Sequence, residues 1–384
     1  RRNGVNGHVA AMSHFAQTRP RTPGSPTPKI RQREKDLFLA GAPWHVTRMN
    51  KPLLSLAAVL ALALPVAAQD AERAGAPSPG EIVAAAPAGD WVAIAPEDLI
   101  VMTLAPDAQG KPRRVVIQLM PAPFSQGWVE NIRTLASARW YDGIAVTRVQ
   151  DNYVVQWGDP NGEDAANAKA LPRGLNAMPE TDYLTPYREG LVQQTWGREG
   201  GVMTPINRGP FRFDDPYTHW IAFAQGWPVA LNRVLRDEGR ESAPDQVWPV
   251  HCYGMVGVGR GYSPDTGTGA ELYTVIGHAP RHLDRNIALV GRVVEGIEHL
   301  SSLPRGTEAL GFCETSSEHT PIVSIRVASD LPASEQPSFQ YLSTESESFA
   351  RYAEARANRR DPFFIAPAGG ADICNIPVPV RPAP

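Results

Sequence analysis

The chain has 384 residues, of which 42% are hydrophobic and 20% charged, with a formal net charge of −3. This composition is typical of a globular protein and argues against a disordered or fibrous chain. It also argues against a nucleic-acid partner, whose binding would require clustered lysine and arginine. The 37 prolines predict many loops, short strands and few long helices.

Residues 49–68 have the pattern of a secretory signal peptide. Lys51 supplies a positive charge, the apolar run at 53–64 is short for a bilayer span, and a small-residue cleavage site ends at Ala68. Cleavage there would start the mature chain at Gln69. We therefore expect an exported bacterial protein, located in the periplasm, that does not span a membrane once the signal is removed.

The rest of the chain is divided by composition. Residues 1–48 lack apolar periodicity and are predicted to be an upstream leader that the mature protein does not contain. Residues 69–92 are rich in alanine, proline and glycine and read as a linker. The predicted segments after it are a folded domain at 93–329, interrupted by an insertion at 159–247, and a Pro-rich C-terminal extension at 330–384.

Regular elements are predicted in both halves of the domain. Trp128, Ile132 and Leu135 recur at helical spacing, which indicates an amphipathic helix. Before the insertion we expect a β-hairpin made of a strand at 97–105 and, within 110–120, a turn followed by a second strand. The helix within 121–143 and strands at 144–149 and 152–157 follow. After the insertion we expect strands at 250–258, 270–277, 287–294 and 321–328, with a short helix at 295–303.

The insertion at 159–247 is rich in glycine, proline, asparagine and aspartate, and a segment of this kind is usually an insertion or a lid. Within it, residues 218–239 are predicted to form a helix interrupted near Gly226 and Pro228. Residues 330–384 are expected to be extended. Many short strands with few helices favour a closed antiparallel barrel or a sandwich, because closure removes exposed strand edges.

Three cysteines, Cys252, Cys313 and Cys374, fit an oxidising compartment as one bridge plus one free thiol. Their spacing matches no zinc pattern, and Pro280 between His278 and His282 argues against a helical metal site. Three pairings remain open. A Cys252–Cys374 bridge is favoured because it would tie the C-terminal extension to a central strand.

Four stretches share an order and internal spacing with one protein family. They are "RRVVIQLMPAPFSQGWVENIRTLASARWYDGIAVTRVQDNYVVQWGDP" from residue 113, "YGMVGVGRG" from 253, "TGAELYTVIG" from 268 and "HLDRNIALVGRVVEG" from 282. The chain resembles the cyclophilin family of peptidyl-prolyl cis-trans isomerases. The resemblance implies a mainly β fold, a closed antiparallel cyclophilin-like β-barrel with two capping helices, into which the segment 159–247 is inserted.

The resemblance also implies a set of site residues. Arg148 falls on the active-site arginine of the family, Glu271 replaces a glutamine and Ile287 replaces a histidine. Leu272 and Tyr273 take the places of two phenylalanines, and His282 that of a tryptophan. The substrate-binding positions implied are Tyr153, Val154, Gln156, Met255, Val256, Glu271, Leu272, Tyr273, His282, Leu283 and Ile287.

The chemistry of the reaction suits such a site. Rotation about a peptide bond has a barrier of about 18–20 kcal/mol, and X–Pro bonds populate both isomers. Because no bond is made, we expect neither a cofactor nor a metal. An apolar pocket to hold the proline ring and a donor that favours the twisted amide suffice. Arg148 is the expected donor, and Glu271 could pair with it.

Other interpretations stay open at this stage. Arg148 could be a solvated residue of an edge strand, Tyr153, Leu272 and Tyr273 could be plain core residues, and Glu271 a surface carboxylate. The expected function is isomerisation of X–Pro bonds in exported proteins. The alternatives are a catalytically weak binding module or chaperone for proline-containing segments, and an envelope structural protein.

Overall fold

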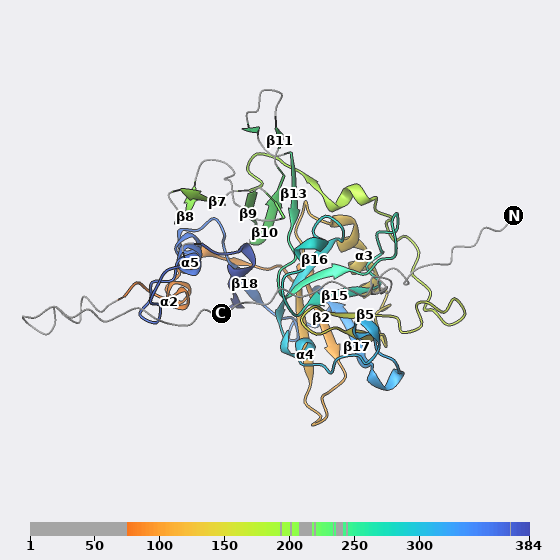
Figure 1. Cartoon of the computed structure of the whole chain (residues 1–384). Helices are drawn as coiled ribbons and strands as arrows, with labels where there is room; N and C mark the ends of the chain where they lie inside the picture. The colour runs from red at the N-terminus through yellow and green to blue at the C-terminus, as the bar shows by residue number, and fades with distance from the viewer. Residues whose placement is uncertain are drawn as a thin grey trace, which may run out of the picture. The chain divides into compact units, whose positions relative to one another are not determined.

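The computed structural model describes residues 75–192, 217–218, 220–232, 245–368 and 370–384, and also the backbone of 194–199, 202–206, 234–235 and 241–242 (Figure 1). The predicted leader, the signal peptide and the first residues of the predicted linker lie outside this part of the chain. Within it, no helix is long and apolar enough to cross a bilayer.

Eight antiparallel strands close into a barrel, as the sequence predicts. Each strand pairs with two neighbours in the order β14-β15-β5-β4-β17-β2-β3-β16, and the pairing of β16 with β14 closes the ring. The strands are β2 (Leu99–Leu104), β3 (Arg113–Leu119), β4 (Ala145–Val149), β5 (Val154–Gly158), β14 (Met255–Val258), β15 (Leu272–Val275), β16 (Leu289–Glu295) and β17 (Thr320–Val327).

Alternation along these strands separates an inner from an outer side-chain layer. Inward side chains enclose a small apolar space whose lining includes Ile117, Trp157 and Ile325. Helix α3 (Gln126–Ser137) contacts β16 and β17 and buries Trp128, Ile132 and Leu135, which confirms the predicted amphipathic helix. The short helix α4 (Glu298–Ser301) contacts β3.

The insertion forms a six-stranded sheet of order β6-β13-β10-β9-β7-β8. Its strands are β6 (Thr185–Pro186), β7 (Gln194–Glu199), β8 (Val202–Ile206), β9 (Trp220–Ala224), β10 (Trp227–Leu231) and β13 (Gln246–Pro249), and a separate pair joins β11 (Val234–Leu235) to β12 (Glu241–Ser242).

The helix predicted over 218–239 is wrong, because its apolar part is the β9–β10 hairpin. Gln225 and Gly226 both have positive φ, as a two-residue hairpin turn requires. Every residue of β9 and β10 is buried, so both faces are apolar. The alternation that marks a strand is therefore missing from the sequence.

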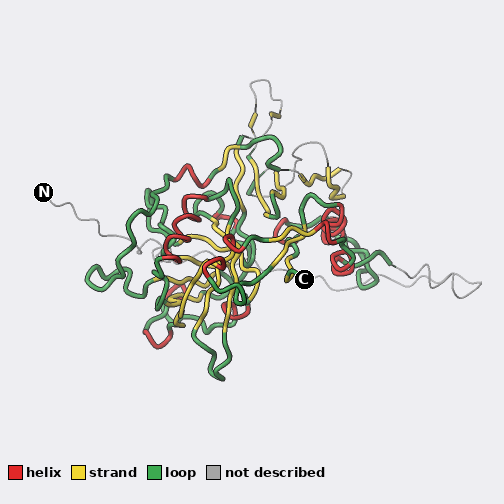
Figure 2. The backbone as a smooth tube through the Cα atoms, turned by 180° about the vertical axis from the view of Figure 1, so that it is seen from behind, coloured by secondary structure: helices red, strands yellow, loops and turns green. Residues whose placement is uncertain are grey.

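The two segments predicted as linker and extended tail fold together. Strand β18 (Phe339–Leu342) pairs with β1 (Trp91–Ala93) on one side and β19 (Val380–Pro382) on the other. Helices α2 (Pro79–Ala84) and α5 (Glu347–Ala357) contact each other and lie side by side in both views (Figures 1 and 2). The extended prediction for 330–384 is thus wrong, because its buried apolar residues have partners near the start of the described chain.

Short 3-10 turns connect the elements. Ser78 caps α2 by accepting from the backbone of Glu81, whose side chain accepts in return from Ser78. A disulfide joins Cys252 to Cys374, and Cys313 is a free, half-buried thiol. The turns are η2 (Ala88–Asp90), η3 (Pro96–Asp98), η4 (Glu180–Tyr183), η5 (Arg281–Leu283), η6 (Ala309–Gly311), η7 (Ser316–Glu318), η8 (Ala328–Asp330) and η9 (Ile373–Asn375).

Candidate active site

Arg148 lies on β4 with 2% of its surface exposed. Its Nε donates to the Leu310 carbonyl at 2.9 Å, Nη1 donates to Gln156 Oε1 at 3.1 Å, and Nη2 donates to Gln150 Oε1. The ring of Phe312 lies over the guanidinium, 4.9 Å from Cζ to the ring centroid. The interpretation of Arg148 as a solvated edge-strand residue is therefore wrong, since β4 lies between β5 and β17 in the closed barrel.

Gln156 connects this arginine to a carboxylate. The residue is opposite Arg148 in the β4–β5 register, and its Nε2 donates to Glu271 Oε1 while its Oε1 accepts from Arg148. Gly259 makes room for the carboxylate, because a Cβ there would lie 2.7 Å from Glu271 Cγ. The link between the two charged groups thus runs through a neutral amide.

Burial sets the directions of the pKa shifts here. It lowers the pKa of Arg148, while the neighbouring Tyr153 and Glu271 act in the opposite direction. It raises the pKa of Glu271, against a hydrogen bond from Gln156 and the charge of Arg148. Burial also raises the pKa of Tyr153 and, more strongly, that of Tyr273. Both phenols are therefore neutral near pH 7.

An apolar cluster lies beside Arg148, on the outside of the barrel. Its members come from β5, β15 and the residues after η5, and are Val154, Tyr273, Val275 and Ile287, with Tyr153 and Leu283 packed against them. The Arg148 guanidinium lies 5.7 Å from the centroid of the Tyr153 ring. The exposed His282 stacks on that ring, with centroids 6.4 Å apart. A guanidinium and a buried apolar cluster are thus adjacent.

Three of the expected binding residues point elsewhere. Leu272 and Val256 line the enclosed apolar space inside the barrel. Leu272 cannot share the pocket with Tyr273, because successive residues of a strand face opposite sides of the sheet. Met255 belongs to the main core and lines a separate cavity that contains the Cys252–Cys374 bridge. The resemblance located these strands correctly, but not the face that each side chain occupies.

A second cavity, of about 340 Å³, opens beside Glu271. Its lining includes charged residues of both signs, Lys169 and Arg260 as well as Asp159 and Asp265, together with several glycines. Through Glu271 this cavity adjoins the hydrogen bonds that lead by way of Gln156 to Arg148.

Several residues of the site were missed by sequence reasoning. Val275 follows Tyr273 by two positions, so strand alternation could have identified it. Phe312 and Leu310 gave no local signal, because they reach Arg148 from a loop more than 160 positions away in the chain. Within the described residues, no group of three His, Cys, Asp or Glu side chains is arranged to hold a metal ion.

Residues 110–329 match the model of the family "cyclophilin type peptidyl-prolyl cis-trans isomerase/CLD". Among solved structures, the cyclophilin AquaCyp293 from Hirschia baltica is similar with a TM-score of 0.53 and 18% identity, over 76% of this chain and 92% of that chain. A cyclophilin type peptidyl-prolyl cis-trans isomerase from Cryptosporidium parvum follows with a TM-score of 0.31 and 10% identity, over 59% of this chain and 98% of that chain. A search among curated proteins found no match. The chain therefore belongs to the cyclophilin-type peptidyl-prolyl cis-trans isomerases, a family of enzymes.

Proposed function

We propose that this isomerase acts on X–Pro bonds of exported polypeptides by a non-covalent mechanism in which Arg148 is the donor. The observation that carries the proposal is the adjacency of the Arg148 guanidinium to Tyr153, which packs on the apolar cluster. A proline ring held against Val154, Tyr273 and Leu283 would present its amide to the arginine. The clients are proline-containing polypeptides, and the reaction requires no cofactor because no bond is broken.

The arginine would act by preferring the transition state. Twisting the amide breaks its resonance, so the proline nitrogen regains a lone pair that can accept a hydrogen bond. A guanidinium is permanently charged and rigid, and hydrogen bonds from charged donors are the stronger ones. Gln150 and Gln156 hold the side chain from two sides, so little reorganisation is needed when the amide twists.

Replacing Arg148 tests this mechanism directly. We expect Arg148→Ala to lower kcat/KM for an Ala-Pro tetrapeptide by one to three orders of magnitude, since loss of one preorganised donor costs up to about 3–4 kcal/mol. Circular dichroism should show that the barrel stays folded. The matched control is Arg114→Ala, on a barrel strand where the arginine is half-exposed and pairs with Glu295. Equal activity of Arg148→Ala and the wild type would refute the mechanism.

A second candidate is a binding module with weak or no catalysis. The observation that favours it is that Arg148 is already in contact with other groups. The Leu310 carbonyl accepts from its Nε, and the Phe312 ring lies over the guanidinium. A donor already held in this way would have to exchange a partner to reach a substrate. Nuclear magnetic resonance of a proline peptide distinguishes an isomerase from a binding module. A binding module would shift the peptide signals without accelerating the exchange between the cis and trans isomers.

We also infer that the protein is exported. Residues 49–68 support this with their signal-peptide pattern, and the Cys252–Cys374 bridge fits an oxidising compartment. Mass spectrometry of the protein from a periplasmic extract should give a mature N-terminus at Gln69. An intact N-terminus upstream of Met49 would contradict the inference.

A further inference from the structure

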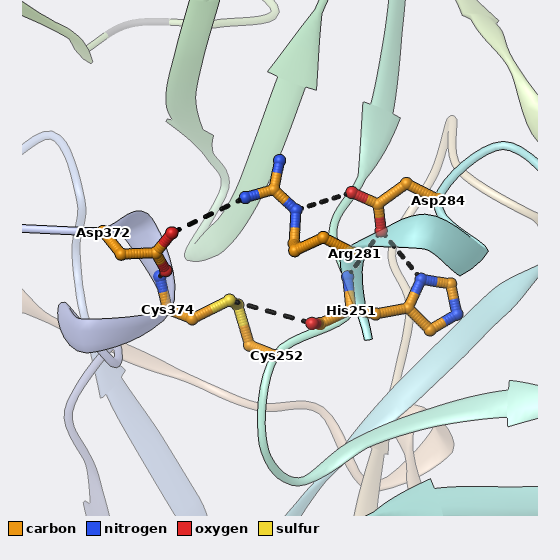
Figure 3. The surroundings of a disulfide bond; sticks show 6 residues. All are labelled: His251, Cys252, Arg281, Asp284, Asp372 and Cys374. Atoms are coloured by element: carbon orange, nitrogen blue, oxygen red, sulfur yellow. Dashed lines mark hydrogen bonds and ion pairs between the residues drawn. A yellow bond between two sulfur atoms is a disulfide. The ribbon is translucent and has the colours of Figure 1, made fainter. Parts of the chain in front are cut away.

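A chain of buried polar side chains lies behind the apolar cluster. Tyr273, His251, Asp284 and Arg281 are 3%, 0%, 4% and 3% exposed. Figure 3 shows His251, Asp284 and Arg281 next to the Cys252–Cys374 bridge. Burying polar groups costs free energy unless they are hydrogen-bonded, so each of these side chains needs a partner in the interior.

The hydrogen bonds run continuously through this chain. His251 Nε2 lies 2.8 Å from the Tyr273 hydroxyl, and its Nδ1 lies 2.8 Å from Asp284 Oδ1. The backbone N–H of His251 donates to the same Oδ1 at 2.9 Å, and Arg281 Nε donates to Asp284 Oδ2 at 2.7 Å. Arg281 Nη1 is 3.9 Å from Asp372 in the C-terminal segment. Each link from the phenol to Arg281 thus has hydrogen-bond geometry.

The donors and acceptors follow from the surroundings. Asp284 accepts from the backbone of His251 and from Arg281, as an ionised carboxylate does, so Nδ1 of His251 carries a proton and donates to it. The other ring nitrogen then accepts from the Tyr273 hydroxyl, which stays protonated because burial raises its pKa. The two rings are nearly parallel, at 9°. The arrangement fixes both the tautomer of His251 and the tilt of Tyr273.

Gly257 allows this tilt. A Cβ at Gly257 would lie 2.4 Å from the hydroxyl oxygen of Tyr273, so the phenol occupies the space that a side chain would need. The ring therefore leans across β14 towards His251. Glycine at 257 thus leaves the space that the Tyr273 phenol occupies where it bonds to His251.

The network connects two parts of the proposed pocket. Tyr273 is a member of the apolar cluster, and Asp284 directly follows Leu283, which packs on the same cluster. His282, on the same turn η5, stacks on Tyr153. A displacement of His251 would thus move a strand residue of the pocket and the turn that faces it.

We propose that His251 and Asp284 are positioning residues for the proline pocket, acting through Tyr273 and Leu283. The proposal rests on the proposed X–Pro function. Arg148 lies on another strand, with its own partners, so the pair controls how well the substrate is held and leaves the donor in place. Loss of His251 or Asp284 should therefore raise KM and leave kcat nearly unchanged.

Steady-state kinetics on an Ala-Pro tetrapeptide test the proposal with two single variants and their combination. Tyr273→Phe keeps the ring and removes the hydroxyl. His251→Leu removes the ring nitrogen that accepts from that hydroxyl. We expect each single variant to raise KM about fivefold to tenfold with kcat within twofold. The double variant should be no worse than His251→Leu alone, because both substitutions break the Tyr273–His251 hydrogen bond and the double variant leaves neither of its two partners unpaired.

The matched control is Tyr352→Phe. This buried tyrosine donates to the Pro377 carbonyl at 2.7 Å and lies in the C-terminal segment, away from the apolar cluster. Its loss should lower Tm without changing KM. If His251→Leu fails to fold, Tyr273→Phe alone decides the question against this control.

An unchanged KM in Tyr273→Phe, or single effects that multiply in the double variant, would overturn the proposal. An equal rise of KM in Tyr352→Phe would do the same. A wild type that does not accelerate isomerisation would instead refute the proposed function. The variants would then be ranked by the Kd of the same peptide from nuclear magnetic resonance titration, where an unchanged Kd for Tyr273→Phe overturns the positioning role.

Discussion

Gln156 accepts a hydrogen bond from Arg148 and donates one to the half-buried carboxylate of Glu271. Burial raises the pKa of Glu271 above its ordinary value of 4.5. A carboxyl group whose pKa is higher in the folded than in the unfolded state binds its proton more tightly on folding. Its contribution to stability is therefore present below pH 4.5 and is lost as the pH rises through the folded pKa.

Glu271→Gln should therefore stabilise the protein at pH 7 relative to wild type, and the difference should shrink at pH 4. An amide remains neutral at both pH values and can still accept the hydrogen bond from Gln156. Urea unfolding at the two pH values measures this. The control is Glu298→Gln, where the side chain is 71% exposed and the same substitution should have little effect. A variant less stable than wild type at pH 7 would contradict the argument.

The same variant should be the faster isomerase. A glutamine at 271 keeps the acceptor oxygen and adds an amide donor that a substrate carbonyl could use. It also removes a negative charge that acts on Arg148. We expect kcat/KM for an Ala-Pro peptide to rise severalfold at pH 7. A value equal to or below that of wild type would show that the carboxylate does not limit the reaction.

At the scale of elements, the sequence predicts a helix or strand well when its apolar residues repeat with a clear period. It predicts poorly a strand that is apolar on both faces. The β2–β3 hairpin and α3 were predictable, because Trp128, Ile132 and Leu135 repeat at helical spacing and the hairpin has a clear turn. The β9–β10 hairpin was not, because its continuous apolar run fits a buried helix as well as a buried strand. In the site, alternation separates Tyr273 from Leu272, but no local pattern places Phe312 over Arg148.

A glycine in the turn between β9 and β10 allows the packing of this hairpin to be tested by substitution. Gly226 has φ +84°, and a Cβ there would lie 2.5 Å from the ring of Tyr341. We expect Gly226→Ala to lower the unfolding free energy by about 1–3 kcal/mol, from backbone strain and the steric overlap together. Gly174→Ala is the control, because φ is +86° there and nothing lies within 4 Å. A loss no larger than in this control would show that Tyr341 moves aside.

For the whole molecule, the contacts that the sequence could not predict are those between its distant ends. Strand β1 has three residues, too few for a reliable strand pattern, and its partner β18 starts about 250 positions later. The cavity at the Cys252–Cys374 bridge is lined by residues of β14, β16 and the C-terminal segment, including Met255, Val293 and Ile376. The tail that looked extended is thus part of the packed structure.

The disulfide should contribute a large share of that attachment. Cys252 and Cys374 are 122 positions apart, so the bridge closes a long loop and restricts the unfolded chain strongly. We expect Cys374→Ser to lower the unfolding free energy by about 2–4 kcal/mol, measured by urea unfolding without reductant. Cys313→Ser is the matched control, since that thiol is free and half-buried, and it should change stability by less than about 1 kcal/mol. Reductant should bring wild type close to Cys374→Ser and leave Cys374→Ser unchanged. If reductant does not affect the wild type, the packing of β18 and α5 holds the C-terminal segment without the bridge.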